Sequence, residues 1–144
     1  MKINLAIGKA GELRVASELL LRGIDVYLPC GDFGIDLILQ NGLKIQVKTA
    51  NKSRHGKYQY YTFNFHSWRK VGKHYIPHNL EDIDFIVLWL LGTERFFIIP
   101  ASQIRGKYSV RLGQVRSDYV KEHNRKESQY LKYENKWELL TEKR

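Results

Sequence analysis

Three polar side chains of chemically useful types stand in two short segments rich in apolar residues: Asp36 in 35–39, and Gln46 and Lys48 in 43–49. Carboxylate and amide oxygens are hard ligands of the kind that Mg²⁺ accepts, together with waters and substrate phosphate. A bound divalent metal polarises a phosphoryl group, and a nearby ammonium stabilises the negative charge that develops on it. If the fold brings these three groups together, the chemistry they suit is hydrolysis of a phosphodiester bond.

The register of a predicted hairpin decides whether they converge. The two segments flank Asn41-Gly42, a strong turn signal. A two-residue loop would place Asp36 on the opposite face from Gln46 and Lys48. A three-residue loop, 40–42, pairs residue 39 with 43 and Asp36 with Gln46, and it gathers the apolar side chains on the other face. It also puts Gly42 at the last loop position, where left-handed geometry is favoured. We therefore predict the three-residue register.

Glu12 is a fourth candidate, on a predicted helix over 8–22. Leu13, Ala16 and Leu20 recur there at helical spacing, and Gly23 supplies the stop. Glu12 shares a helical face with the apolar residues three, four and seven positions later, the side expected to approach the core. A carboxylate on that side needs a partner, and a metal site would provide one. Judged in isolation, Glu12 is more typical of an exposed helix carboxylate.

The remaining pattern predicts a mixed sheet with the first helix packed on one face, an α/β or α+β fold. Strands are expected at 24–28, 35–39, 43–49, 58–65, 83–91 and 95–99, with a basic turn at 51–57 and an irregular, exposed stretch at 67–80. Tyr130, Tyr133, Trp137 and Leu140 suit a docked terminal helix, although an extended segment is also compatible. With 144 residues we expect one domain, with a core over about 5–100 and a basic extension over about 101–144.

The charge distribution points to a polyanionic partner. The chain has 24 Lys and Arg against 15 Asp and Glu, a net charge of +9. Residues 44–80 carry eight basic side chains and no acidic one, interleaved with aromatic rings. Basic groups neutralise phosphates and aromatic rings stack on bases, although a solvated β-surface with core aromatics is the alternative. Our predicted DNA contacts are Lys52, Arg54, His55, Lys57, Tyr58 and Tyr60, on a turn and strand that could enter the major groove.

Composition also excludes several classes. A single Cys30 allows no internal disulfide and no cysteine-based zinc cage. The longest apolar run, 85–91, is too short to cross a membrane, and the N-terminus lacks a signal-peptide pattern. We therefore expect an intracellular, cytoplasmic protein associated with the nucleoid, with no membrane contact.

Together these residues resemble the PD-(D/E)XK nuclease superfamily, which has the restriction-endonuclease fold. The matching pieces are Gly8-Lys-Ala-Gly-Glu12 opening a helix, Gly34-Ile-Asp36 starting a strand, and Gln46-Val-Lys48 on the next. The resemblance covers about residues 5–50, and the strands near 84–88 and 97–100 look like the rest of such a core. It implies that Glu12, Asp36 and Gln46 bind Mg²⁺, with Mn²⁺ as a substitute, and that Lys48 assists catalysis.

Two positions depart from the family pattern. Ile35 replaces the motif proline, which mainly affects entry into the strand. Gln46 replaces an acidic residue, and the loss of one negative charge should weaken metal binding. Glu12 could compensate for that loss, or the site could be degenerate.

The Gln46-Val-Lys48 variant looks most like the PD-(D/E)XK homing endonucleases encoded by bacterial group I introns. The alternatives are a Holliday junction resolvase-like nuclease or a catalytically weak DNA-binding relative. Either kind of nuclease cuts two strands, whereas one chain carries one site, so we expect a homodimer or homotetramer on double-stranded DNA. No small-molecule cofactor is expected.

Overall fold

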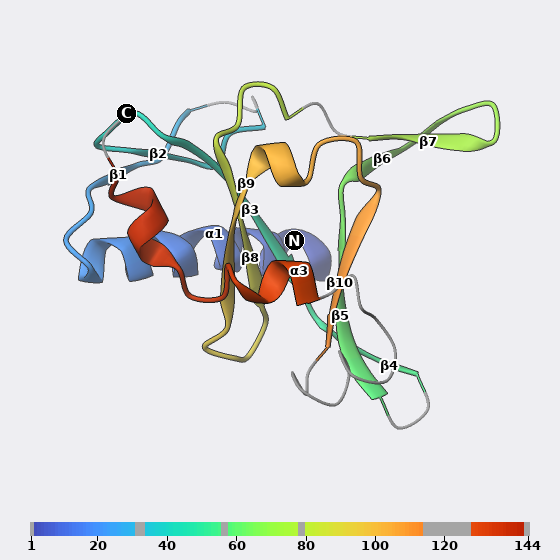
Figure 1. Cartoon of the computed structure of the whole chain (residues 1–144). Coiled ribbons are helices and arrows are strands. Elements are labelled where there is room, and N and C mark those ends of the chain that lie inside the picture. The colour runs from blue at the N-terminus through green and yellow to red at the C-terminus, as the bar shows by residue number, and fades with distance from the viewer. Residues whose placement is uncertain (1, 31–33, 56–57, 78–79, 114–127, 143–144) are drawn as a thin grey trace.

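The computed structural model describes residues 2–30, 34–55, 58–77, 80–113 and 128–142. Its elements form a mixed α/β arrangement (Figure 1). In chain order they are α1 (Ile3–Leu21), β1 (Val26–Tyr27), β2 (Leu37–Leu39), β3 (Lys44–Ala50), β4 (Lys52–His55), β5 (Tyr58–Asn64), β6 (His66–Val71), β7 (His74–Pro77), β8 (Phe85–Leu90), β9 (Phe96–Pro100), the 3₁₀ turn η1 (Ala101–Gln103), β10 (Ser109–Gly113), α3 (Ser128–Leu131) and the 3₁₀ turn η2 (Trp137–Leu140). Within these ranges, no helix is long and apolar enough to cross a membrane.

The central sheet has the strand order β1-β2-β3-β8-β9. β3 and β8 are parallel and the other neighbours are antiparallel. One face of this sheet is covered by α1, whose Val15 and Leu19 are fully buried against β2, β3 and β9. Burial alternates along β2 and through the first part of β3, because every second side chain points to the helix.

A second sheet, in the order β10-β5-β4, covers the opposite face. Its inward side chains, including Tyr61, Phe63 and Leu112, pack on Ile86 and Leu88 of β8 in a separate core cluster. Figure 1 shows this sheet on the right of the central sheet, away from most of α1. The fold is therefore three layers, helix, sheet and sheet, with β3 and β8 buried between the outer two.

The first helix differs from its prediction in two ways. It begins at Ile3 rather than at residue 8, and two of the three residues used to predict it are exposed. Leu13 and Leu20 face solvent, while the buried face holds Gly11, Val15, Ala16 and Leu19. The buried face was predicted wrongly because the outer side of the helix is also apolar. Helical periodicity therefore fits two faces of α1 and does not tell which one is buried.

Two predicted irregular segments are strands. The basic turn expected over 51–57 begins with β4, which pairs with β5. The stretch expected to be irregular over 67–80 contains most of β6 and all of β7, which pair with each other as a two-stranded ribbon. The sequence of both segments lacks clean apolar alternation, so the pattern predicted no strand there.

The C-terminal segment is not one helix. It forms α3 and η2, joined by residues that run along the edge of β9, where Ile98 N–H donates to Tyr133 O at 3.0 Å and Asn135 N–H to Phe96 O at 2.6 Å. Tyr130 is buried on one face of the central sheet and Trp137 on the other. A single helix would keep both rings on one side, so the chain must cross the sheet edge, and it turns at Asn135 with a φ of 53°.

Candidate functional site

The hairpin between β2 and β3 has the predicted register. Leu37 pairs with Ile45, Ile38 pairs with Lys44, and Leu39 N–H donates to Leu43 O at 2.9 Å, so the loop has three residues. Asp36, which precedes β2, therefore lies opposite Gln46 on β3. Its side chain also anchors it there, because the carboxylate Oδ2 accepts the Val47 backbone N–H at 2.7 Å.

The Asp36 carboxylate is half-buried and has a raised pKa. Its pKa is raised from 3.8 to about 6, chiefly by burial and also by the charge and hydrogen bonding of Glu12. The Val47 N–H and the Lys48 charge oppose this rise. Asp36 and Glu12 thus lie close enough to disfavour two negative charges, and a cation between them would relieve that repulsion.

Lys48 stands two residues beyond Gln46 on the same side of β3, in the position paired with Leu88 of the parallel strand. Burial lowers the pKa of its ammonium, and the nearby Asp36 charge partly restores it. A half-buried ammonium has lost much of its water and holds a defined place next to the carboxylate. Such a group is suited to stabilise charge that develops on a phosphate.

Gln46 forms a row of neighbouring side chains with Asp36 and Lys48, which we call the row. Its side-chain Nε2 donates to Gly34 O at 3.4 Å. Its Oε1 is buried and has no hydrogen-bond partner. A buried amide oxygen without a partner is costly, and it is the ligand atom a hard cation would take.

Glu12 reaches this row from α1. It is half-buried, and its carboxylate accepts a hydrogen bond from Lys9 Nζ at 3.1 Å. The helix can come this close because Gly11 has no side chain where it crosses β3. A Cβ atom added at Gly11 would lie 1.7 Å from Thr49 Oγ1 and 3.0 Å from Thr49 Cβ. Gly11 thus sets the distance between the helix carboxylate and the strand residues.

Gly11→Ala is expected to destabilise the fold by about 1–3 kcal/mol, because the overlap with a β-branched side chain forces the backbone to move. It should also reduce metal affinity by moving Glu12. The matched control is Gly8→Ala in the same helix, where an added Cβ has no atom within 4 Å and should instead stabilise by up to about 1 kcal/mol. Urea unfolding of both variants tests this; equal stabilities would mean that the close contact at Gly11 has no effect.

The donor set can be compared with what a metal would require. Within the described ranges, no group of three His, Cys, Asp or Glu residues is arranged to hold a metal ion. The candidate set instead combines two carboxylates, Glu12 and Asp36, with the unpartnered amide oxygen of Gln46. All three donors are oxygens, as Mg²⁺ and Mn²⁺ prefer, and no soft ligand is present. The residues therefore fit a hard divalent cation with few protein ligands.

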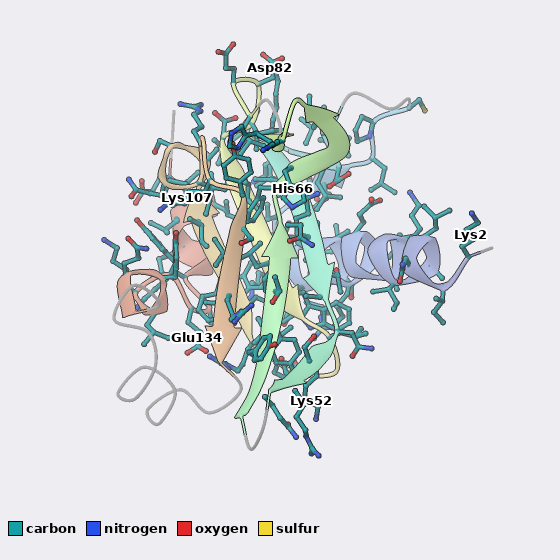
Figure 2. All side chains as sticks on the ribbon, turned by 90° about the vertical axis from the view of Figure 1, so that its right-hand side faces the viewer. Lys2, Lys52, His66, Asp82, Lys107 and Glu134 are labelled. Carbon is teal, nitrogen blue, oxygen red and sulfur yellow. The ribbon has the colours of Figure 1, made fainter. Side chains whose placement is uncertain are left out.

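The six predicted DNA contacts do not form one surface. Lys52 pairs with Tyr61 and Arg54 with Gln59, whereas Tyr60 alternates to the outer face of the same sheet. Figure 2 shows Lys52 extending from the lower end of this sheet. His55 and Tyr58 pair at the end of β4 and β5 and are described by backbone alone, and Lys57 lies outside the described residues.

Sequence reasoning missed Arg111 on β10. Its guanidinium lies over the Tyr60 ring, 4.3 Å from the centroid, and it is exposed. It shares the outer face of the second sheet with Tyr60, Thr62 and Asn64. Because β10 pairs with β5 across more than 40 residues of sequence, local charge counting over 44–80 could not find it; the apolar alternation of Val110 and Leu112 was the available signal.

One acidic residue outside the row has a structural role. Asp84 Oδ2 accepts the backbone N–H of Lys44 at 2.8 Å, which fixes the start of β3 beside β8. This is consistent with a capping role for Asp84.

Two of three comparisons with known proteins give a match. A model of the PD-(D/E)XK endonuclease family matches residues 4–140. Among solved structures, the bacterial homing endonuclease I-Ssp6803I is similar, with a TM-score of 0.74 and 23% sequence identity over 96% of this chain and 93% of that chain. A search of curated protein sequences gives no significant match. The structural likeness confirms a restriction-endonuclease-like homing endonuclease fold, and since the family model spans nearly the whole chain, this protein belongs to the PD-(D/E)XK endonuclease family.

Proposed function

We propose that the protein is a sequence-specific, Mg²⁺-dependent endonuclease that cleaves double-stranded DNA, of the homing type. The observation that carries this proposal is the row formed by Asp36, just before β2, and by Gln46 and Lys48 on β3, the middle strand of the central sheet. Asp36 is held by Val47 N–H, Gln46 Oε1 is buried without a partner, and Lys48 is half-buried beside them. The homing assignment is supported by the fold shared with I-Ssp6803I and by the Gln46-Val-Lys48 sequence.

Glu12, Asp36 and Gln46 would hold the metal. When bound, Mg²⁺ or Mn²⁺ supplies Lewis-acid polarisation of the phosphoryl group and lowers the pKa of the attacking water. Asp36 supplies the negative charge that fixes a cation in this place, and its bond to Val47 N–H orients the carboxylate. Lys48 contributes a positive charge that stabilises the additional negative charge on the phosphate as the bond to it forms.

DNA would contact the second sheet as well as the row of Asp36, Gln46 and Lys48. We assign base or phosphate contacts to Arg111 and Tyr60 on the outer face of this sheet. Lys52, at its lower end (Figure 2), and Arg54, two residues further along β4, are assigned contacts as well. An arginine stacked on an aromatic ring is held in place, so little rotamer entropy is lost when it binds guanine or phosphate. We further propose that two or four copies act together, because each chain carries one such row and duplex cleavage needs two.

The function is tested by comparing substrates. The purified protein is incubated with Mg²⁺, Mn²⁺ or EDTA and with two DNAs, a randomised linear duplex library and an immobile four-way junction. We expect metal-dependent cutting of a small subset of the linear duplexes at one long sequence. Preferential cutting of the junction would favour a resolvase. Binding without cleavage under any metal would overturn the enzyme assignment and leave a DNA-binding relative.

Arg111→Ala is expected to weaken duplex affinity by about 10-fold, since one charge-assisted contact to DNA is worth about 1–3 kcal/mol. The matched control is Lys136→Ala, an exposed basic residue beside η2 on the other side of the molecule. Fluorescence anisotropy at fixed salt measures both. If the two variants bind equally well, the outer face of the second sheet is not the DNA surface.

A further inference from the structure

The outer side of α1 is an unpartnered apolar surface. Eight large hydrophobic side chains are exposed in the described part of the chain, and seven of them come from α1 or from β1 and the residue that follows it. On α1 the exposed fractions are 76% for Ile3, 51% for Leu13, 55% for Leu20 and 81% for Leu21. Contiguous apolar patches of this kind are typical of protein interaction sites.

The residues of this surface have coiled-coil spacing. Positions 3, 6, 10, 13, 17 and 20 follow alternating intervals of three and four, and none of them is charged. They comprise Ile3, Ala6, Ala10, Leu13, Ser17 and Leu20, which we call the α1 stripe. It lies nearly opposite the side of the helix that packs on β3. Figure 2 shows the start of α1, with Lys2 at its tip, projecting clear of both sheets.

The α1 stripe is complementary to the same stripe of a second copy when the two helices run antiparallel. If two α1 helices run antiparallel about a two-fold axis, Leu13 of each lies against Ala10 of the other, and Ile3 lies against Leu20. Large residues then meet small ones at the centre, which is what close helix packing requires. A parallel pair would instead set Lys9 of one helix beside Arg14 of the other, two like charges at flanking positions.

The α1 stripe can form the centre of an interface between two copies. A standard interface buries about 800 Å² per partner; a helix stripe about 28 Å long and about 10 Å wide supplies about 280 Å² of this, and the surface beside it has to supply the rest. The 19 residues of α1 extend about 28 Å. Tyr27 at 59% exposure and Leu28 at 53% widen the apolar surface at the end near β1.

We propose that the α1 stripe is the contact between two copies of this chain, arranged antiparallel about a two-fold axis. The proposal deepens the assembly suggested under the proposed function, but the apolar surface exists whether or not the chain cuts DNA. Its test therefore uses the full-length protein without DNA or metal. An apolar contact free of charge should also persist or strengthen in 0.5 M NaCl, unlike association through nucleic acid.

Sedimentation equilibrium on wild type should show a dimer or larger assembly at about 10 μM. Leu13→Lys should raise the dissociation constant about 100-fold or more, because two ammonium groups would enter the centre of the contact. The control is Leu5→Lys, an equally drastic change at a leucine that is 65% exposed on the same helix but outside the stripe; it should assemble as wild type does. A monomeric wild type at 100 μM, or equal dissociation of both variants with unchanged circular dichroism, would overturn the proposal.

The antiparallel direction is tested with cysteines in a Cys30→Ser background, because Cys30 is exposed. Ile3→Cys and Leu20→Cys chains should form a disulfide when mixed, and each alone should not, because identical positions lie about 25 Å apart in this arrangement. Efficient cross-linking of Ile3→Cys with itself would indicate parallel helices and overturn the stated geometry.

Discussion

Lys48→Met is expected to reduce the rate of DNA cleavage by about 10²- to 10³-fold, the usual effect of removing one preorganised charge-stabilising group. The duplex should still bind, because the substitution keeps the length and apolar stem of the side chain on β3. Burial lowers the pKa of the Lys48 ammonium, so an apolar replacement costs the fold little. Single-turnover cleavage and anisotropy, measured on the same preparation, separate the two effects.

The matched control for this substitution is Lys44→Met. Lys44 lies on the same strand and the same side, four residues earlier, where it pairs with Ile38. Its variant should cleave within about threefold of wild type. If Lys48→Met keeps full activity, or if both variants lose it equally, the catalytic assignment of Lys48 is wrong.

Asp36→Asn should abolish metal binding and cleavage while preserving the fold. The asparagine oxygen can still accept the Val47 N–H that the carboxylate accepts at 2.7 Å, so the local backbone has no reason to move. Only the charge is lost, and charge is the main attraction for a divalent cation in a site with few protein ligands. Calorimetric titration with Mn²⁺ should give heat with wild type and none with the variant. The exposed Asp25→Asn serves as control.

The same variant predicts a pH dependence of stability with a definite sign. Since the pKa of Asp36 is raised from 3.8 to about 6 in the fold, the folded state keeps a proton that the unfolded chain has already lost between these values. The stability contributed by protonated Asp36 is therefore complete below about pH 3.8 and lost as the pH rises through about 6. Without metal, wild type should lose stability relative to Asp36→Asn from pH 4 to pH 8.

Thermal unfolding at pH 8 with and without Mg²⁺ completes that experiment. Metal should raise the Tm of wild type, because it binds the folded state and relieves the repulsion between Asp36 and Glu12, and it should leave Asp36→Asn unchanged. A Tm rise of equal size in both proteins would place the metal elsewhere.

The row of site residues was predictable because one local rule fixed it. The alternation of apolar residues in the β2 and β3 segments allowed a single hairpin register, and that register brought Asp36 opposite Gln46. Glu12 was predictable for a similar reason: the face of the helix that it shares with Val15 and Leu19 is buried. Local periodicity is informative wherever one side of an element is buried and the other is polar.

Other features depended on contacts between distant segments. Arg111 reaches Tyr60 only because β10 pairs with β5, and the two halves of the C-terminal segment are separated because their aromatic rings fill cores on opposite faces of the central sheet. The outer side of α1 misled the prediction of its buried face, since Leu13 and Leu20 are apolar and exposed. An interface between copies has the same residue types as a core, so one chain's sequence does not distinguish them.

The layered arrangement of the second sheet has a consequence for how this nuclease could acquire new targets. The inward residues Tyr61, Phe63 and Leu112 maintain the core, while Tyr60, Thr62 and Arg111 alternate with them on the solvent side. The proposed recognition residues on the solvent side can therefore mutate without disturbing packing. Only Asn51 separates the end of β3 from the start of β4, so the proposed catalytic residues on β3 stay at a fixed spacing from the second sheet. A lineage of such enzymes could change its preferred sequence by surface mutations alone while keeping the position of the cut.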